Sequence, residues 1–336
     1  MSRWCGVLIA LAAFLVSVAP DAAADAAGPT DYQSAIASVD PPTSSIAVSM
    51  IGGDSFVRLE LLEPVDVMVI GYRGENYLRF DADGSVHENR RSPSTWLNED
   101  RYGTEDALPP FVDYQAPPQW VQVADGGAYS WHDHRSHWMN TQRPPGAMAG
   151  DQVLEATLPL LVNSESVVVT VTSHLLASPS VWPPTLAVVA GVVLGVSIAR
   201  RELRIGWTLL VLVAALIAFV LGAIAFRSVP SETEPSQLLW LLPAIAIACA
   251  LFTAATRNRQ ATTVWLDGLT TAAGALVAAW AIVRFDALRR ALIPSDAPAI
   301  IDRLMIAAVL PIGIVIALRG LWGLLHPKRL IETNQR

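Results

Sequence analysis

The chain is 336 residues long, 52% of them are hydrophobic, and its mean hydropathy is +0.40. A composition this apolar excludes an ordinary soluble protein and predicts membrane-spanning segments. Residues 28–181 hold 20 acidic and 8 basic residues, a net charge of −12, whereas residues 182–336 hold 8 acidic and 14 basic residues, a net charge of +6. We therefore expect an acidic external domain joined to a membrane domain. Nucleic acid is excluded as a partner, because an acidic surface repels phosphates.

Residues 1–27 have the three parts of a secretory signal peptide. Arg3 supplies positive charge, residues 7–18 form an apolar stretch, and small residues with A-x-A patterns follow at 22–26. An uncleaved first anchor is the alternative, but the apolar stretch is shorter than the roughly 20 residues of a membrane span. The two cysteines of the chain, Cys5 and Cys249, lie outside residues 28–181. The external domain therefore has no disulfide and no thiolate metal ligand.

Five further apolar segments each approach the length that a membrane-spanning helix needs. They are residues 182–199, 205–226, 238–255, 264–283 and 304–325. Basic clusters follow the first, third and fifth segments, and the positive-inside rule makes that side cytoplasmic. We therefore expect a plasma-membrane protein with residues 28–181 outside and a short cytoplasmic C-terminal tail. One loop disagrees, since Arg284, Arg289 and Arg290 would lie outside.

Charged residues within the segments are few. Asp267 and Arg319 lie a turn or two inside the expected cytoplasmic boundary. We expect Arg319 to reach the interface and Asp267 to cap or pair locally, and a membrane pair between the two is a further hypothesis. The G-x-x-x-G motif at Gly191 and Gly195 is expected to serve packing within the chain. No charge falls at mid-span, so no transport path is predicted.

In the acidic half, short runs of β-branched and apolar residues between turn residues predict strands. These runs are residues 46–50, 56–62, 65–72, 77–80, 85–88, 153–162 and 167–175, and residues 28–44 before them are expected to be a linker. Many short strands with Pro- and Gly-rich turns predict an all-β extracytoplasmic domain, an Ig-like β-sandwich. Residues 89–150 are irregular, but their aromatic side chains provide surface to bury, which argues against disorder.

Residues 129–139, YSWHDHRSHWM, hold three of the six histidines of the chain. In an extended segment His132 and His134 would project from one face about 7 Å apart, and two such imidazoles can share a metal ion. His137 would join them only if the chain turns, which Ser136 permits. Imidazole and carboxylate ligands without a thiolate suit Cu(II) or Zn(II). Further possible donors are His87, Asp133 and Met139.

The same stretch also fits a structural brace that needs no ion. Asp133 can orient an imidazole or bind an arginine, and a tryptophan can carry a stacked guanidinium. The supporting cluster would be Arg90, Arg91, Trp131, Arg135 and Trp138. Such a cluster would hold the irregular segment in shape and present the domain to a protein partner, for example another envelope protein.

A metal-dependent hydrolase is the third hypothesis. The spacing H-x-H-x-x-H is that of metallo-β-lactamase sites, but that family has Asp where this chain has Ser136, and its α/β sandwich does not match the β-rich pattern. The chain also has no G-x-S-x-G elbow and no nucleophilic cysteine. We therefore assign no catalytic residue and expect a binding or accessory module rather than an enzyme.

Three runs carry a resemblance to a known family. GYRGENYLRF at 71–80, ENRRSPSTWLNEDRYG at 88–103 and YSWHDHRSHWM at 129–139, with the W-P-P entry into the first span, resemble a family of uncharacterised actinobacterial membrane proteins. The resemblance covers residues 45–184 and implies an extracytoplasmic domain on a membrane anchor. It also implies that ENRRSP and WHDHR belong to one shared site.

The sequence as a whole predicts three parts. Residues 1–27 are the signal peptide, residues 28–181 the extracytoplasmic β-sandwich, and residues 182–336 a five-helix transmembrane domain in the lipid bilayer. The predicted function is a binding module with copper or zinc as the candidate ions at His132, His134 and His137.

Overall fold

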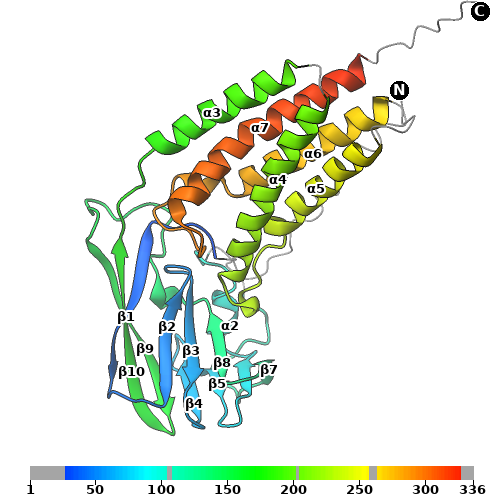
Figure 1. The fold of residues 1–336 in the computed structure, drawn as a ribbon. Coiled ribbons are helices and arrows are strands. Elements are labelled where there is room, and N and C mark those ends of the chain that lie inside the picture. Colours follow the sequence, from blue (N-terminus) through cyan, green and yellow to red (C-terminus); the bar gives the residue numbers. More distant parts are fainter. Residues whose placement is uncertain (1–26, 104–107, 202–203, 257–262, 327–336) are drawn as a thin grey trace, which may run out of the picture.

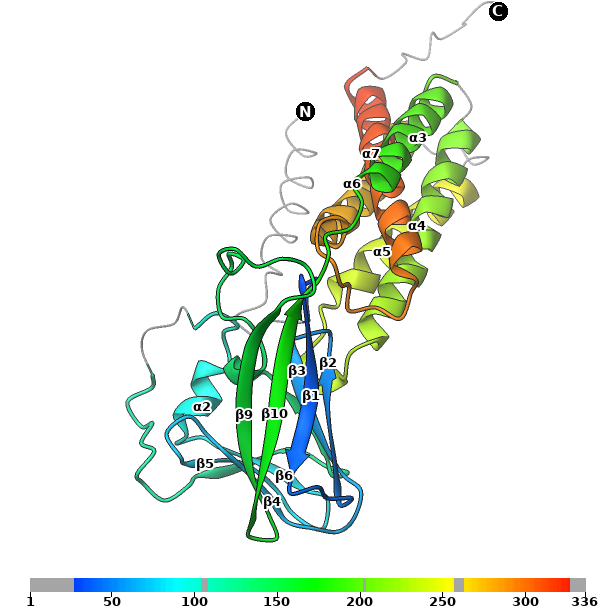
Figure 2. The same cartoon turned by 90° about the vertical axis from the view of Figure 1, so that its left-hand side faces the viewer.

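The computed structural model describes residues 27–103, 108–201, 204–256 and 263–326. The signal-peptide prediction and most of the predicted tail fall outside these ranges. Strands make up the N-terminal part of the chain and long helices the C-terminal part, and the two parts lie end to end (Figures 1 and 2).

In the described ranges, ten strands form two antiparallel sheets. The larger sheet has the order β1-β10-β9-β4-β5-β6-β7 and the smaller one the order β2-β3-β8. The strands are β1 (Tyr32–Asp40), β2 (Ile46–Ile51), β3 (Phe56–Leu61), β4 (Val67–Ile70), β5 (Asn76–Phe80), β6 (Val86–Asn89), β7 (Trp120–Ala124), β8 (Ala128–Trp131), β9 (Gln152–Val162) and β10 (Glu165–Leu175).

One apolar core lies between the two sheets. Leu59 of β3, Leu78 of β5 and Val169 of β10 are fully buried and belong to the same cluster. Along β10 every second residue is buried, which is the pattern of a strand with one face on a core. The predicted β-sandwich is therefore confirmed, with a large and a small sheet.

Two parts of the β-rich half differ from the sequence-based expectation. Residues 28–44 are not a linker, because Tyr32–Asp40 form β1 and pair with β10 at the edge of the larger sheet. Ala, Ser and Asp give this strand little β propensity, so its pairing with β10 and the burial of Tyr32 decide the conformation. Residues 89–150 contain the short helix α2 (Pro93–Leu97) as well as β7 and β8.

Five helices of the described chain are long and apolar enough to cross a membrane, so this is a multi-pass membrane protein. They are α3 (Trp182–Ala199), α4 (Arg204–Arg227), α5 (Leu238–Thr256), α6 (Thr263–Val283) and α7 (Ala299–Leu325). All five predicted spans are present, and the last helix begins at Ala299 rather than at residue 304.

The G-x-x-x-G motif of α3 packs within the chain, as expected. A Cβ atom at Gly191 would lie 2.4 Å from the backbone oxygen of Ala308, and one at Gly195 would lie 3.3 Å from Val315 Cβ. Both neighbours belong to α7, so the two glycines allow α3 and α7 to approach closely.

The β-sandwich meets the helix bundle at the α4–α5 and α6–α7 connections (Figure 1). Thr30 and Leu292 pair through two backbone hydrogen bonds of 3.0 and 2.8 Å. The buried carboxylate of Asp31 accepts hydrogen bonds from Arg290 at 2.9 Å and from Arg143 at 3.0 Å. Polar contacts therefore join the sandwich to the α6–α7 connection.

Two of the three arginines that depart from the charge pattern of the loops have acidic partners. Arg290 binds Asp31, and the guanidinium of Arg284 lies 2.6 Å from the carboxylate of Asp302 in α7. These arginines hold the α6–α7 connection in place and have acidic partners.

Candidate metal centre

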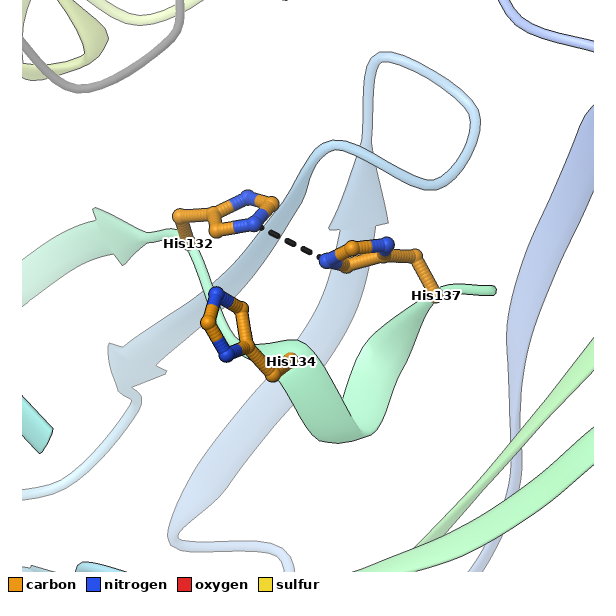
Figure 3. A group of neighbouring side chains, drawn as sticks. All are labelled: His132, His134 and His137. Carbon is orange, nitrogen blue, oxygen red and sulfur yellow. Dashed lines mark hydrogen bonds between the residues drawn. The ribbon is translucent and has the colours of Figure 1, made fainter. Parts of the chain in front are cut away.

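The three histidines meet because the chain turns immediately after β8. Residues His134–Ser136 form a single 3-10 turn, capped by the side chain of Asp133. Ser136 closes the turn by donating from its amide at 2.9 Å and from its hydroxyl at 2.6 Å to the carbonyl oxygen of Asp133. The turn brings His137 back toward His132, as Figure 3 shows. Of the two geometries that the sequence left open, the turn that Ser136 permits is the one present, and it begins after the extended residue Asp133.

One nitrogen of each histidine lies within 4.8 Å of a nitrogen of the other two. His132 Nε2 and His137 Nε2 are 2.9 Å apart, and the ring centroids of the three residues are 4.6 to 5.8 Å apart. The His132 and His137 rings are buried and the His134 ring is half-buried. Among the described residues, this is the group of three or more His, Cys, Asp or Glu side chains with the spacing of a metal site.

Each imidazole is also held by a backbone carbonyl group. The carbonyl oxygens of Ser55, Asp100 and Trp138 lie 2.7, 2.7 and 3.1 Å from His132 Nδ1, His134 Nε2 and His137 Nδ1. A carbonyl oxygen can only accept, so each of these ring nitrogens carries the proton. His132 and His137 therefore present the unprotonated Nε2 to each other. His134 has Nε2 on a carbonyl and can join them by turning its ring or by releasing that carbonyl.

Both buried imidazoles are neutral at physiological pH. Burial lowers the pKa of His132 to about 4, and the charge of Arg101 acts in the same direction. Burial likewise lowers the pKa of His137 to about 2, with further lowering by the charges of His132 and Arg101. In the other tautomer of either ring an N–H lies between the two nitrogens, whereas with both rings donating to their carbonyl groups two lone pairs face each other at 2.9 Å. A cation between the two nitrogens removes this repulsion, because the neutral imidazole nitrogen is a metal ligand.

The second half of the motif forms a brace around the histidines. Asp133 is fully buried, and its carboxylate accepts from Arg135 at 2.8 and 2.9 Å and from the indole N–H of Trp131 at 3.1 Å. Burial raises the pKa of Asp133, but the hydrogen bonds and charge of Arg135 outweigh it and hold the pKa below its ordinary value. The Arg135 guanidinium stacks on the ring of Tyr72, with its carbon 4.8 Å from the centroid. The predicted pairing of Asp133 with an arginine is thus present.

The possible further donors fall outside the cluster, with one exception. His87 lies on β6 and faces Asp81 at 3.2 Å, and the carboxylate of Asp133 is used by Arg135. Met139 is 37% exposed, and both its methyl group and the His134 ring lie against Gly103. Met139 thus borders the site next to His134.

The other supporting residues also separate. Arg90 stacks on Trp96 with its guanidinium carbon 4.0 Å from the ring centroid, and Arg91 donates to the carbonyl oxygen of Pro117 at 3.2 Å. Trp131 belongs to the core between the sheets. Trp138 is not a core residue, since it is only half-buried. Arg90 and Arg91 therefore do not reach the histidines.

Sequence reasoning missed three side chains that position the cluster. The Tyr72 hydroxyl contacts Asn98, donates to Asp133 at 3.3 Å and accepts from the His134 amide at 2.9 Å. Arg101 lies nearby and pairs with the buried carboxylate of Asp54 at 2.6 Å. The signal for these residues was available, since Tyr72 lies in the run 71–80 and Asn98 and Arg101 in the run 88–103.

Three imidazole side chains are suitable ligands for a small divalent cation, but the rings would have to move to bind one. A tetrahedral ion with metal–nitrogen bonds of about 2.0–2.1 Å holds its ligand nitrogens ~3.4 Å apart. The separation of 2.9 Å between His132 and His137 would have to widen slightly, and His134 would have to move closer. The carbonyl bonds of the opposite nitrogens are those that metal-ligating histidines ordinarily make.

The two membrane residues named from the sequence lie at the α6–α7 and α4–α7 contacts. Asp267 is buried in α6 beside Gly323, where an added Cβ atom would lie 2.5 Å from its carboxylate. The Arg319 guanidinium stacks on Trp207 of α4, with its carbon 4.0 Å from the ring centroid. The pairing of Asp267 with Arg319 stays a prediction.

Comparison of the chain with protein-family models, with curated proteins and with solved structures finds no match. The function must therefore be inferred from the histidine cluster and its position in the fold.

Proposed function

We propose that this protein is a membrane-anchored binding module that holds one divalent transition-metal ion, Zn(II) or Cu(II), at His132, His134 and His137. The observation that carries the proposal is the orientation of His132 and His137. Each ring donates one N–H to a backbone carbonyl and directs the other nitrogen at its neighbour, 2.9 Å away. Imidazole ligands without thiolates favour Zn(II) or Cu(II), and three ligands leave a fourth position for a ligand from elsewhere.

The location that we propose is the outer face of the plasma membrane. The acidic composition of residues 28–181, the predicted signal peptide and the basic clusters that follow the first, third and fifth spans in the sequence support it. Membership of the actinobacterial family is likewise a proposal, supported by the meeting of the three resembling runs around the histidines.

In the rival function, the same residues only stabilise the domain surface that a protein partner binds. Asp133 and Arg135 are suited to this role because their hydrogen bonds already fix the turn. The two functions differ in what the facing His132 and His137 nitrogens require. A brace needs a hydrogen bond between them, and therefore a proton. A metal site needs a cation there. Metal-dependent hydrolysis is not favoured, because His137 is fully buried, whereas a hydrolytic ion must face an open cleft that admits a substrate.

The test is metal binding by the full chain purified in detergent and stripped with a chelator. We expect one Zn(II) or Cu(II) per chain by metal analysis, and ligand-field bands of nitrogen-ligated Co(II) after loading with that probe. His132→Gln should weaken the affinity for the metal by at least about 100-fold. Loss of a residue that only hydrogen-bonds to a metal ligand already costs up to about 100-fold, and His132 is itself a proposed ligand.

His174→Gln is the matched control, because His174 lies on β10 and outside the cluster. A parent chain that takes up no Zn(II), Cu(II) or Co(II) after loading would overturn the proposal in favour of the brace. Equal binding by His132→Gln and the parent would place the metal elsewhere.

A further inference from the structure

A second feature of the fold bears on how a cation would reach the histidines. A cavity of about 300 Å³ lies where the β-sandwich meets the α4–α5 connection. The sandwich contributes Trp131 and His132 to its wall, and the connection contributes Thr233 with its two neighbouring glutamates. Among the three histidines, His132 is the one that lines this cavity.

The lining of this cavity holds more carboxylates than cations. Its charged residues are Glu88, Glu99, Glu232 and Glu234, with Arg90 as the one cation among them. Arg90 pairs with Glu88 and Arg58 pairs with Glu232, so the four carboxylates exceed these two guanidinium groups by two charges. Glu88 belongs to the ENRRSP run and His132 to WHDHR, so both runs line this cavity, and their membership of one functional site stays a prediction. Carboxylates gathered around one cavity attract cations into it.

The carboxylate from the α4–α5 connection is fixed in position. Arg58 of β3 donates to Glu232 at 3.0 Å and to the hydroxyl of Ser130 at 3.2 Å. The membrane domain therefore supplies part of the cavity wall and is tied to the strand that leads to the histidines.

A second cavity, of about 240 Å³, lies on another side of the site. It is lined by Trp138, the neighbour of His137, and its charged residues are Arg101, Arg290 and Asp286. Arg101 and Arg290 are paired with Asp54 and Asp31, so this lining lacks the excess of carboxylates that the acidic cavity has, and the electrostatics favour the acidic cavity as the route.

We infer that the acidic cavity is the vestibule through which a divalent cation reaches the histidine cluster, with the His132 ring as the gate between them. The inference rests on the proposed function, since without a metal site there is nothing to enter. His132 is suited to this role because it lines the cavity, whereas its Nε2 lies 2.9 Å from Nε2 of His137, which does not line it.

The test measures the rate of Co(II) association with the chelator-stripped full chain in detergent by stopped-flow absorbance. Glu232→Gln/Glu234→Gln removes two vestibule charges without changing side-chain shape. Glu155→Gln/Glu165→Gln removes two exposed charges from the β9–β10 hairpin and is the matched control. Glu234→Gln alone leaves the Arg58–Glu232 contact intact. It therefore distinguishes the loss of charge from a displacement of the α4–α5 connection.

We expect the vestibule variant to bind Co(II) about 3- to 10-fold more slowly at low ionic strength, with the difference shrinking as salt rises. Glu234→Gln should show part of this effect, and the control pair should match the parent. Equal rates for all chains, or equal slowing by the vestibule and control pairs, would overturn the vestibule while leaving the metal site standing. Failure of the parent to bind Co(II) would overturn both proposals.

Discussion

Replacing His137 by glutamine separates metal binding from fold stability. The glutamine amide reaches about as far as the His137 Nε2 and can donate an N–H to His132 Nε2, where the parent has two opposed lone pairs. The new hydrogen bond contributes roughly 0.5–1.5 kcal/mol, and ordering the glutamine side chain costs about 1.5–2 kcal/mol. We therefore expect the free energy of unfolding of the metal-free variant to lie within about 1.5 kcal/mol of that of the parent.

The two chains should differ when the metal is present. At a free metal concentration of 1,000 times the dissociation constant, binding stabilises the parent by about 4 kcal/mol. A variant that binds about 100-fold more weakly gains ~1.4 kcal/mol at the same concentration. For a domain of this size the difference of about 3 kcal/mol corresponds to a Tm difference of roughly 6–12 °C.

The assay is thermal unfolding of the full chain in detergent, followed by tryptophan fluorescence with and without Zn(II). His87→Gln is the control, since His87 faces Asp81 and lies outside the cluster. It should keep the full metal response. A metal-dependent rise in Tm that is equal in the parent and His137→Gln would refute the reasoning.

Three further substitutions test the contacts around the site and the bundle. Arg135→Gln leaves the buried Asp133 carboxylate without its cation and should lower the free energy of unfolding by about 3–5 kcal/mol in urea titrations, and adding Asp133→Asn should recover part of it. Asp31→Asn should weaken the contact between the sandwich and the helix bundle by about 1–2 kcal/mol, a figure lowered because both arginine partners are half-exposed to solvent. The measurement is amide hydrogen exchange, which should become faster in the α6–α7 connection. Burial raises the pKa of Asp31, but its hydrogen bonds hold that pKa below 3.8, so the contribution is present above about pH 4 and is lost as the pH falls through the folded-state pKa. Gly222→Ala places a Cβ atom 1.8 Å from a backbone oxygen of α5 and should lower the Tm by several degrees, whereas Gly268→Ala, with no atom within 4 Å, should leave it unchanged.

Each of these expectations has a contrary result. Full stability of Arg135→Gln would mean that Asp133 finds another cation. Unchanged exchange in Asp31→Asn, or an equal effect of Asp40→Asn at the exposed end of β1, would remove Asp31 from the docking contact. Normal stability of Gly222→Ala would show that α4 and α5 can separate without cost.

Regular patterns in the sequence were sufficient for the two-part architecture. The apolar segments are long enough to span a bilayer only as helices, because backbone polar groups need internal partners in lipid. The alternation of Val with Val or Thr along 167–175 could bury one face only as a strand. Both arguments depend on residues close in the chain, and both are confirmed by α3 to α7 and by β10.

The edge strand β1 depended on tertiary context. Its sequence, YQSAIASVD, has weak β propensity and reads as a linker. It becomes a strand because β10 offers an unpaired edge with a matching register from Tyr32 to Asp40. No local pattern in residues 28–44 predicts that they pair with the edge of β10.

The sequence by itself identified the three histidines and the arginine–aspartate brace, because the residue types and their spacing are local. It left open whether those histidines meet, since an extended chain would send His137 to the other face. The tertiary structure decided that through the turn at Ser136 and through carbonyl groups from residues 55 and 100, far away in the chain. A backbone carbonyl has no sequence signature, and it is the carbonyls that set which nitrogen of each buried ring is free to bind.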